Sequence, residues 1–220
     1  MDDQNPFYKI ILLSSGYPGK TCLINRYINN TYLEDVCATS SSSFQIKDVI
    51  LNNGIKITVH IWDSSGSETF MSLNKIFLKN SKGIILLYDI TQKSSLEKTI
   101  NCYNYLKDYI TEDVVIALVG NKLDLYEHCE ITSEEGKRIA NEHNFLFFEV
   151  SAKEGINVDE CFKSLIQRIY EKEHNIENEH NIENENDNEN GHDIENEPKK
   201  LSDKKIRLRK NRPGKKGCLK

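Results

Sequence analysis

Three consecutive residues, Gly19, Lys20 and Thr21, have the types and the position that phosphate binding requires. They follow the apolar run 8–13 and precede a segment with helical spacing. In a phosphate-binding loop, backbone N–H groups and a helix N-terminus face the phosphates, the lysine reaches the β and γ phosphates, and the hydroxyl ligates Mg²⁺. By themselves, these residues are also compatible with a plain connection between a strand and a helix.

The complete loop, residues 14–21, departs from the usual pattern of such loops. Its first glycine is replaced by Ser14, and Pro18 lies inside the expected phosphate cradle. Because proline has no N–H group, one possible donor to phosphate is absent. The sequence therefore predicts a phosphate-binding loop that lacks one of its usual donors.

A second segment, Ile61-Trp62-Asp63-Ser64-Ser65-Gly66, ends another apolar run. At the end of a strand, the Asp63 carboxylate can hold Mg²⁺ through water, and the Gly66 N–H can contact a γ-phosphate. The alternative is an ordinary aspartate-glycine turn. The position at a strand end favours the phosphate-binding interpretation.

Two later segments, 119–124 (Val-Gly-Asn-Lys-Leu-Asp) and 150–153 (Val-Ser-Ala-Lys), could recognise a base. The Asp124 carboxylate can accept hydrogen bonds from the N1 and N2 donors of guanine, which adenine does not present. A backbone N–H near Ala152 can meet the guanine O6. All four segments stand in order at the carboxyl ends of predicted strands, which indicates guanine-nucleotide binding.

Short apolar runs alternate with amphipathic stretches over the first 170 residues, which is typical of an α/β fold. The turn Asn52-Asn53-Gly54 predicts a hairpin between the second and third strands, so one edge strand is antiparallel in a mostly parallel, six-stranded sheet. The predicted strands are 8–13, 44–51, 55–62, 83–88, 114–119 and 145–150, and the predicted helices are 19–29, about 92–110, 132–143 and 157–170.

The 220 residues, 38% of them hydrophobic, suffice for one packed domain and a tail. We expect an N-terminal extension (1–6), a domain (7–170), a disordered spacer (171–197) and a basic tail (198–220). The spacer holds 11 acidic residues and one lysine, and the tail holds 11 basic residues and one aspartate. The spacer has too little apolar surface to offset its ordering entropy.

The sequence argues against several classes of protein. Its longest apolar run is far shorter than the roughly 20 residues that cross a bilayer, and its first residues are acidic and polar. Its six cysteines include no Cys-x-x-Cys pair, which disfavours a disulfide framework or a zinc site. We therefore expect a cytoplasmic protein.

The order Gly-Lys-Thr, Trp-Asp-x-x-Gly, Asn-Lys-Leu-Asp and Ser-Ala-Lys resembles the Ras superfamily over residues 7 to about 170. Trp62, the run 19–23 and a long tail with a terminal cysteine resemble the Rab branch. The resemblance implies a P-loop NTPase small G domain with helices on both faces of the sheet. It also implies a GTPase that uses Mg²⁺, switches between GTP and GDP, and regulates vesicle trafficking on the cytosolic face of an endomembrane. Effectors, exchange factors and GAP proteins would be its partners, and nucleic acid would not.

The resemblance also implies roles for individual residues. Tyr32 would stack on guanine, and Thr39 would be the switch I threonine that reaches Mg²⁺. The metal ligands would be Thr21, Thr39 and Asp63, and the catalytic groups Lys20, Thr39, Gly66 and Ser67. The full set of nucleotide-binding residues would be Gly16, Tyr17, Pro18, Gly19, Lys20, Thr21, Cys22, Tyr32, Thr39, Gly66, Asn121, Lys122, Asp124, Ser151, Ala152 and Lys153.

Two departures from the family pattern concern hydrolysis and partner binding. Ser67 stands where the family has a glutamine that orients the attacking water, and a serine side chain is too short for this role. We therefore expect slow intrinsic hydrolysis; the alternative function is a guanine-nucleotide-binding scaffold with little turnover. The serines at 40–43 replace apolar residues that normally meet effectors, although they could merely make a mobile loop.

The basic tail ends near a single cysteine, Cys218, which only two residues follow. A polybasic segment beside a lipidated cysteine is a two-signal membrane anchor, which would bind an anionic leaflet. The ending does not match the C-a-a-X pattern, so lipidation of Cys218 is a hypothesis from position alone. Alternatives are a nuclear-localisation or nucleic-acid patch, or a tail that folds back on the acidic spacer.

Overall fold

The computed structural model describes residues 7–14, 16, 19–32, 34, 43–63 and 78–189, with side chains described as far as residue 175. The chain divides into two compact units, Met1–His180 and Asn181–Lys220. The first unit contains the sheet and the candidate site. Of the second unit the structure describes residues 181–189, which are helical.

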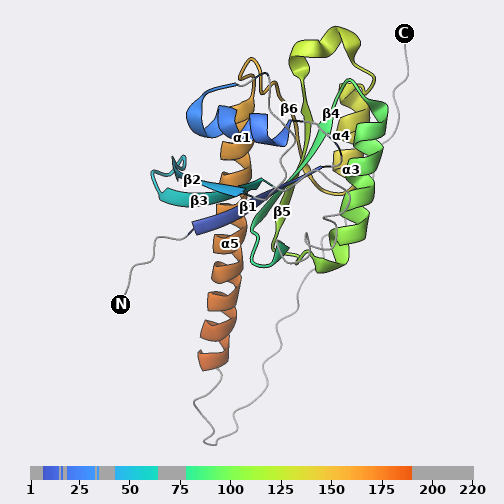
Figure 1. Cartoon of the computed structure of the whole chain (residues 1–220). Coiled ribbons are helices and arrows are strands. Elements are labelled where there is room, and N and C mark those ends of the chain that lie inside the picture. Colours follow the sequence, from blue (N-terminus) through green and yellow to red (C-terminus); the bar gives the residue numbers. More distant parts are fainter. Residues whose placement is uncertain are drawn as a thin grey trace, which may run out of the picture. The chain divides into compact units, whose positions relative to one another are not determined.

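A six-stranded sheet with the order β2-β3-β1-β4-β5-β6 forms the centre of the first unit (Figure 1). β1 pairs in parallel with β3 and β4, and β4, β5 and β6 continue the parallel part. β2 is antiparallel to β3 and lies at one edge, as the hairpin turn predicted. The strands are β1 (Phe7–Leu13), β2 (Ser43–Ile50), β3 (Lys56–Asp63), β4 (Gly83–Asp89), β5 (Val115–Asn121) and β6 (Leu146–Glu149).

Helices cover both faces of the sheet, which confirms the predicted α/β architecture (Figure 1). On one face α1 and α5 bury Tyr27 and Phe162, whose rings stack with centroids 3.9 Å apart. On the other face α3 and α4 bury Leu96, Leu106 and Ala140. The helical segments are α1 (Lys20–Asn29), α3 (Lys93–Leu106), η2 (Lys107–Tyr109), η3 (Leu123–His128), α4 (Ser133–Glu142) and α5 (Val158–Glu189).

The burial of each strand follows its place in the sheet. β4 is central and every one of its seven residues is buried, whereas β2 at the edge is mostly exposed. α5 lies so close to β4 that a Cβ on Gly83 would be 2.9 Å from Ile169 Cδ1. Because β1, β3, β4, β5 and β6 are parallel, their carboxyl ends lie on the same side of the sheet. Open α/β sheets bind their ligands at these ends.

The structure differs from the sequence-based expectation at the end of α5. The helix continues from residue 170 to Glu189, where we expected a disordered spacer to begin at residue 171. Lys82 Nζ forms ion pairs with Glu173 (2.8 Å) and Asp113 (3.2 Å), and Lys172 Nζ donates to the Glu112 carbonyl. These polar contacts hold residues 172 and 173 against the domain, although the segment has no apolar periodicity. The boundary of the folded domain therefore lies beyond residue 170.

The N-terminal extension 1–6, residues 190–197 of the expected spacer and the basic tail 198–220 lie outside the described residues. None of the helices that the structure describes is both long enough and apolar enough to cross a membrane.

Candidate nucleotide-binding site

The phosphate loop joins the end of β1 to the first turn of α1. Gly16 and Gly19 both have positive φ angles, 79° and 88°, which side chains other than glycine rarely allow. A Cβ on Gly19 would also lie 2.9 Å from Asn121 Nδ2. Gly19 caps α1 without a side-chain hydrogen bond, and the first turn carries no acidic residue. The helix therefore presents its positive end to the loop, as an anion site requires.

Lys20 is buried at the start of α1 and contacts a residue that sequence reasoning treated only as a departure. Its Nζ donates to Ser14 Oγ at 2.6 Å, and the side chain is 6% exposed. Burial lowers the pKa of Lys20, whereas the charge of Asp63 and the neighbouring Cys102 oppose that shift. Glycine, the usual residue at position 14, has no hydroxyl group. In this chain the Ser14 hydroxyl holds the lysine that should bind phosphate.

Thr21 and Asp63 meet beside this lysine. Thr21 Oγ1 donates to Asp63 Oδ2 at 2.5 Å, which joins α1 to the end of β3. Asp63 is 4% exposed, and its Oδ1 is buried without a hydrogen-bond partner among the described residues. Burial raises the pKa of Asp63, and the Thr21 hydrogen bond and the Lys20 charge oppose this. A buried carboxylate oxygen without a partner, next to a threonine hydroxyl, fits Mg²⁺.

No group of three or more His, Cys, Asp or Glu side chains in the described part of the chain could hold a metal ion. Mg²⁺ does not require one, because it usually binds one or two protein ligands together with waters and substrate phosphates. Thr21 and Asp63 are therefore compatible with a Mg²⁺ site in the described part of the chain.

The base side of the site is a set of hydrogen bonds between the ends of β5 and β6. Asn121, 2% exposed, accepts the Ala152 N–H on Oδ1 at 3.1 Å, and Ser151 Oγ donates to Asp124 Oδ1 at 2.6 Å. Lys122 has a positive φ of 71°, and its Nζ pairs with Asp89 Oδ2 at 2.6 Å. The structure thus brings together residues that sequence reasoning placed in two separate segments.

The N–H of Ala152 is directed at Asn121 rather than at an open space. In the same turn the Lys153 N–H has no protein partner among the described contacts. Lys153 is therefore the backbone donor near Ala152 that remains available to a ligand oxygen.

Tyr32 and Lys153 lie at the border of the base side. Burial raises the pKa of Tyr32; Cys22 and Asp124 add to this, while Lys153 opposes it. Lys153 Nζ also lies 3.7 Å from Glu34 Oε1. The role of Tyr32 in base stacking stays a prediction.

Sequence reasoning missed Arg26, which lies in α1 and contacts the 151–154 turn, and Asp89, the partner of Lys122. No local pattern could have found the contact of Arg26 with this turn, because its partners there lie more than 120 residues away in the chain. Asp89, like Asp63, is an acidic residue at the end of an apolar strand, and this pattern could have indicated it. Unlike Asp63, it is not followed three residues later by a glycine.

Several residues expected at the site lie outside the described residues, so their roles stay predictions. They are Tyr17, Pro18, Thr39, Gly66 and Ser67, together with Cys218 in the tail.

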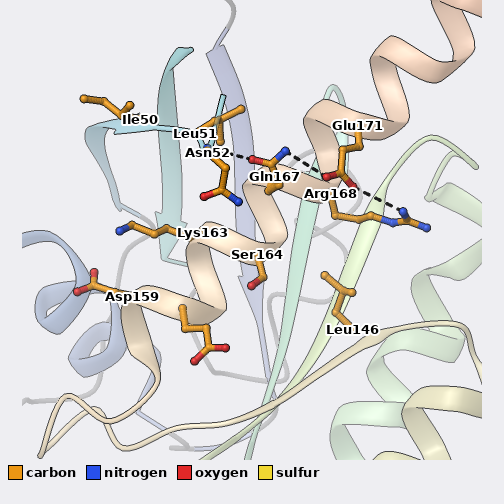
Figure 2. A pocket seen from close by; sticks show the side chains of 11 residues that line it. Ile50, Leu51, Asn52, Leu146, Asp159, Lys163, Ser164, Gln167, Arg168 and Glu171 are labelled. Carbon is orange, nitrogen blue, oxygen red and sulfur yellow. Dashed lines mark hydrogen bonds and ion pairs between the residues drawn. The ribbon is translucent and has the colours of Figure 1, made fainter. Parts of the chain in front are cut away.

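A cavity of about 530 Å³ lies at the other edge of the sheet, between the β2–β3 turn and α5 (Figure 2). Three of its polar side chains, Gln167, Arg168 and Glu171, are linked: Gln167 accepts the Asn52 N–H at 3.4 Å and donates to Glu171 at 3.1 Å. Arg168 pairs with the same Glu171 at 3.7 Å. Because Leu146 in its wall begins β6, the cavity is separate from the carboxyl-end site.

Comparison with known proteins agrees with this geometry. The sequence model of the Ras family matches residues 9–171. Human "Ras-related protein Rab-12" is 38% identical over 165 residues, which cover 74% of this chain and 67% of that protein. "Ras-related protein Rab-13" of Rattus norvegicus is 35% identical over 165 residues, 75% of this chain and 81% of that protein. "Ras-related protein Rab-10" of Diplobatis ommata is 34% identical over the same length.

The fold, the four segments in order and the extent of the match agree. The chain belongs to the Ras family and is a Rab-like small GTP-binding protein, a GTPase that acts as a molecular switch.

Proposed function

We propose that the described site binds GTP and GDP with Mg²⁺, and that the switch serves intracellular vesicle trafficking. One observation carries the proposal: Ser151 Oγ bonds Asp124 at 2.6 Å and Asn121 bonds the Ala152 N–H at 3.1 Å. This base pocket adjoins the Gly19 turn of the phosphate loop, because a Cβ on Gly19 would meet Asn121.

On the base side, Asp124 accepts the N1 and N2 protons of guanine. Adenine offers neither donor in that arrangement, so the carboxylate selects guanine. The Lys153 N–H, with no protein partner among the described contacts, donates to the guanine O6, and Tyr32 stacks on the ring.

On the phosphate side, Lys20, now bonded to Ser14, would bind the β and γ phosphates, and the Thr21 hydroxyl, now bonded to Asp63, would be available to hold Mg²⁺. Mg²⁺, when bound, would be held by Thr21, Asp63 and Thr39 and would neutralise phosphate charge. Lys20 stabilises the charge that develops as water attacks the γ-phosphorus.

Hydrolysis is slow in this proposal because Ser67 replaces the residue that orients the attacking water. Restoring that residue in Ser67→Gln should raise the single-turnover rate of GTP cleavage by about tenfold. An unchanged rate in Ser67→Gln, or an ordinary family rate in the wild type, would contradict this explanation.

An exposed apolar face on the edge of the sheet is suited to partner proteins. Phe44, Ile46 and Ile50 on β2 are 49%, 53% and 68% exposed. Phe44 stacks on Trp62 of β3 with ring centroids 4.8 Å apart. Exposed apolar patches of this kind mark interaction sites, so effectors and regulators would contact this face.

The basic tail with Cys218 would attach the protein to the cytosolic face of an endomembrane. Eleven basic residues at 198–220 favour an anionic leaflet, and a lipid on Cys218 would supply the second signal. In cell fractionation, Cys218→Ser should move the protein from the membrane pellet to the supernatant. Equal partitioning of the two proteins would remove the lipid anchor from the proposal.

The nucleotide proposal is tested on the purified full chain. We expect GDP or GTP to co-purify, to be identified after denaturation, and to leave faster when EDTA removes Mg²⁺. A preparation that carries no nucleotide and binds none would contradict the proposal. Bound GTP with no cleavage in a single turnover would instead favour a scaffold with little turnover.

A further inference from the structure

Arg26 in α1 connects the backbone carbonyl group of Asn30, at the end of the same helix, with the adjacent carbonyl groups of Ala152 and Lys153, which lie far away in the sequence. Its Nε donates to the Ala152 carbonyl at 2.9 Å, and its Nη2 donates to the Lys153 carbonyl at 2.5 Å. Its Nη1 donates to the Asn30 carbonyl at 2.9 Å and to Asn30 Oδ1 at 3.1 Å. A guanidinium group suits this arrangement because its donors have a fixed, planar geometry.

The two bonds to the 151–154 turn fix the orientation of two peptide groups. In a trans peptide the C=O and the following N–H point in opposite directions. Because the Ala152 and Lys153 carbonyls face Arg26, the N–H groups of Lys153 and Glu154 must point away from it. The Glu154 N–H accordingly donates to Ser151 Oγ at 3.0 Å.

Ser151 passes this orientation on to Asp124. Its hydroxyl oxygen accepts the Glu154 N–H and its hydroxyl proton goes to Asp124 Oδ1 at 2.6 Å. Ser151 is fully buried, at 0% exposure, so its hydroxyl is shielded from solvent, whereas Asp124 is partly exposed. The chain of contacts therefore runs from Arg26 through the turn to the carboxylate that faces the base.

We propose that Arg26 is a positioning residue for guanine recognition: it holds the 151–154 turn so that Ser151 aims Asp124 at the base. The proposal rests on the base site described under the proposed function. Arg26 itself does not touch the nucleotide. The same turn orientation also directs the Lys153 N–H away from Arg26, toward the base side of the site.

A purely structural role is the competing explanation, because Arg26 also closes the end of α1 through Asn30, whose φ is 53°. Such a role would lower stability and weaken every nucleotide alike. A positioning role acts on the contact with the guanine 2-amino group. GDP carries that group and IDP lacks it, so the ratio of their dissociation constants separates the two explanations.

The test measures GDP and IDP binding to full-length wild type, Arg26→Gln and Arg26→Lys in Mg²⁺, with melting temperatures. We expect the preference for GDP over IDP to fall about tenfold in Arg26→Gln. Arg26→Lys should also lose preference, because one ammonium group cannot replace the planar fork. Arg138→Gln is the matched control, since Arg138 pairs, among the residues that the structure describes, only with the exposed Glu142 in α4.

A double-mutant cycle with Ser151→Ala tests the route. If Arg26 acts through Ser151, adding Arg26→Gln to Ser151→Ala should cause little further loss of preference. Equal weakening of GDP and IDP in both Arg26 variants would overturn the proposal and leave a structural role. If Arg26→Gln does not fold, the Arg26→Lys ratio decides alone. A wild type without preference for GDP would overturn the base site and this inference together, whereas a preference retained in the variants overturns only the inference.

Discussion

The base side and the phosphate side of the site are built in opposite ways. On the base side, Asn121 and Ser151 are buried and their hydrogen bonds hold the turn and Asp124 in place. On the phosphate side, the groups that should meet the ligand are bonded to one another, Lys20 to Ser14 and Thr21 to Asp63. Guanine therefore meets a prepared surface, whereas phosphate and Mg²⁺ must replace contacts within the protein.

This difference has an energetic consequence. Preorganised hydrogen bonds cost little when the ligand arrives, and their loss leaves buried groups without partners. Bonds that the ligand must displace subtract from its affinity. We therefore expect substitutions on the base side to weaken binding strongly, and removal of the competing bond on the phosphate side to strengthen it.

The largest effect should come from Asp124→Asn. The amide would lose one acceptor and present an N–H₂ group to the guanine 2-amino group, so GDP affinity should fall at least about 100-fold. The same amide can donate to the C2 carbonyl of xanthine, so XDP binding should improve. Titrations with GDP and XDP measure both effects.

Asp108→Asn is the control for this change, because Asp108 is exposed in η2 and away from the site. Unchanged GDP affinity in Asp124→Asn would mean that the base side does not select guanine through this carboxylate. This result would contradict the difference proposed between a preorganised base side and a phosphate side whose internal bonds the ligand must replace.

A smaller effect, of the opposite sign, is expected from Ser14→Ala. Losing the hydroxyl removes the 2.6 Å bond that holds Lys20, so the lysine is free for phosphate and GDP release should slow about fivefold. Stopped-flow exchange of a fluorescent GDP analogue gives the rate.

Ser14→Gly separates the hydroxyl from backbone freedom. If competition for Lys20 is the cause, Ser14→Gly and Ser14→Ala should slow release equally. Faster release from Ser14→Ala would show that the hydroxyl supports nucleotide binding instead of competing with it.

The sequence predicted the sheet, its antiparallel edge and the four segments at the strand ends, because these depend on local patterns. Apolar runs such as Gly83–Asp89 identify buried strands, and Gly19 is required by a φ of 88°. The sequence order of the segments then put Lys20, Asp63 and Asp124 at one edge of the sheet.

The features that were missed depend on polar contacts between distant segments. In the 151–154 turn, the partners of Arg26 are the carbonyl groups of Ala152 and Lys153. Any residue type supplies a carbonyl, so the sequence does not reveal this contact. In the sequence, Ser14 was only a substitution of the usual glycine. The structure shows its hydrogen bond to Lys20. The sequence did not predict that α5 continues beyond residue 170, because an ion pair, rather than apolar spacing, holds Glu173.

The smallest effect should come from Glu173→Gln. Because Glu173 lies far from the base side and the phosphate side of the site, this substitution tests whether nucleotide affinity depends only on residues near the site. The Glu173 hydrogen bond, with help from Asp113, raises the pKa of Lys82 above its ordinary 10.5. A raised lysine pKa stabilises the fold below about pH 10.5 and ceases to do so as the pH rises through the folded-state value. The Lys82 and Glu173 side chains are 33% and 28% exposed, so the loss should be only about 0.5 kcal/mol at pH 7.

Denaturant unfolding at pH 7 and at pH 11.5 measures this loss, with Glu142→Gln as the control because its partner Arg138 is 61% exposed. The difference between wild type and Glu173→Gln should shrink at the higher pH, since the charge of Lys82 is increasingly lost as the pH rises through its folded-state pKa. GDP affinity should not change, because Glu173 pairs with Lys82, which precedes β4 and therefore lies at the amino ends of the strands, opposite the site. A change in GDP affinity would mean that α5 transmits strain to the base side, whose hydrogen bonds would then depend on more than their own turn.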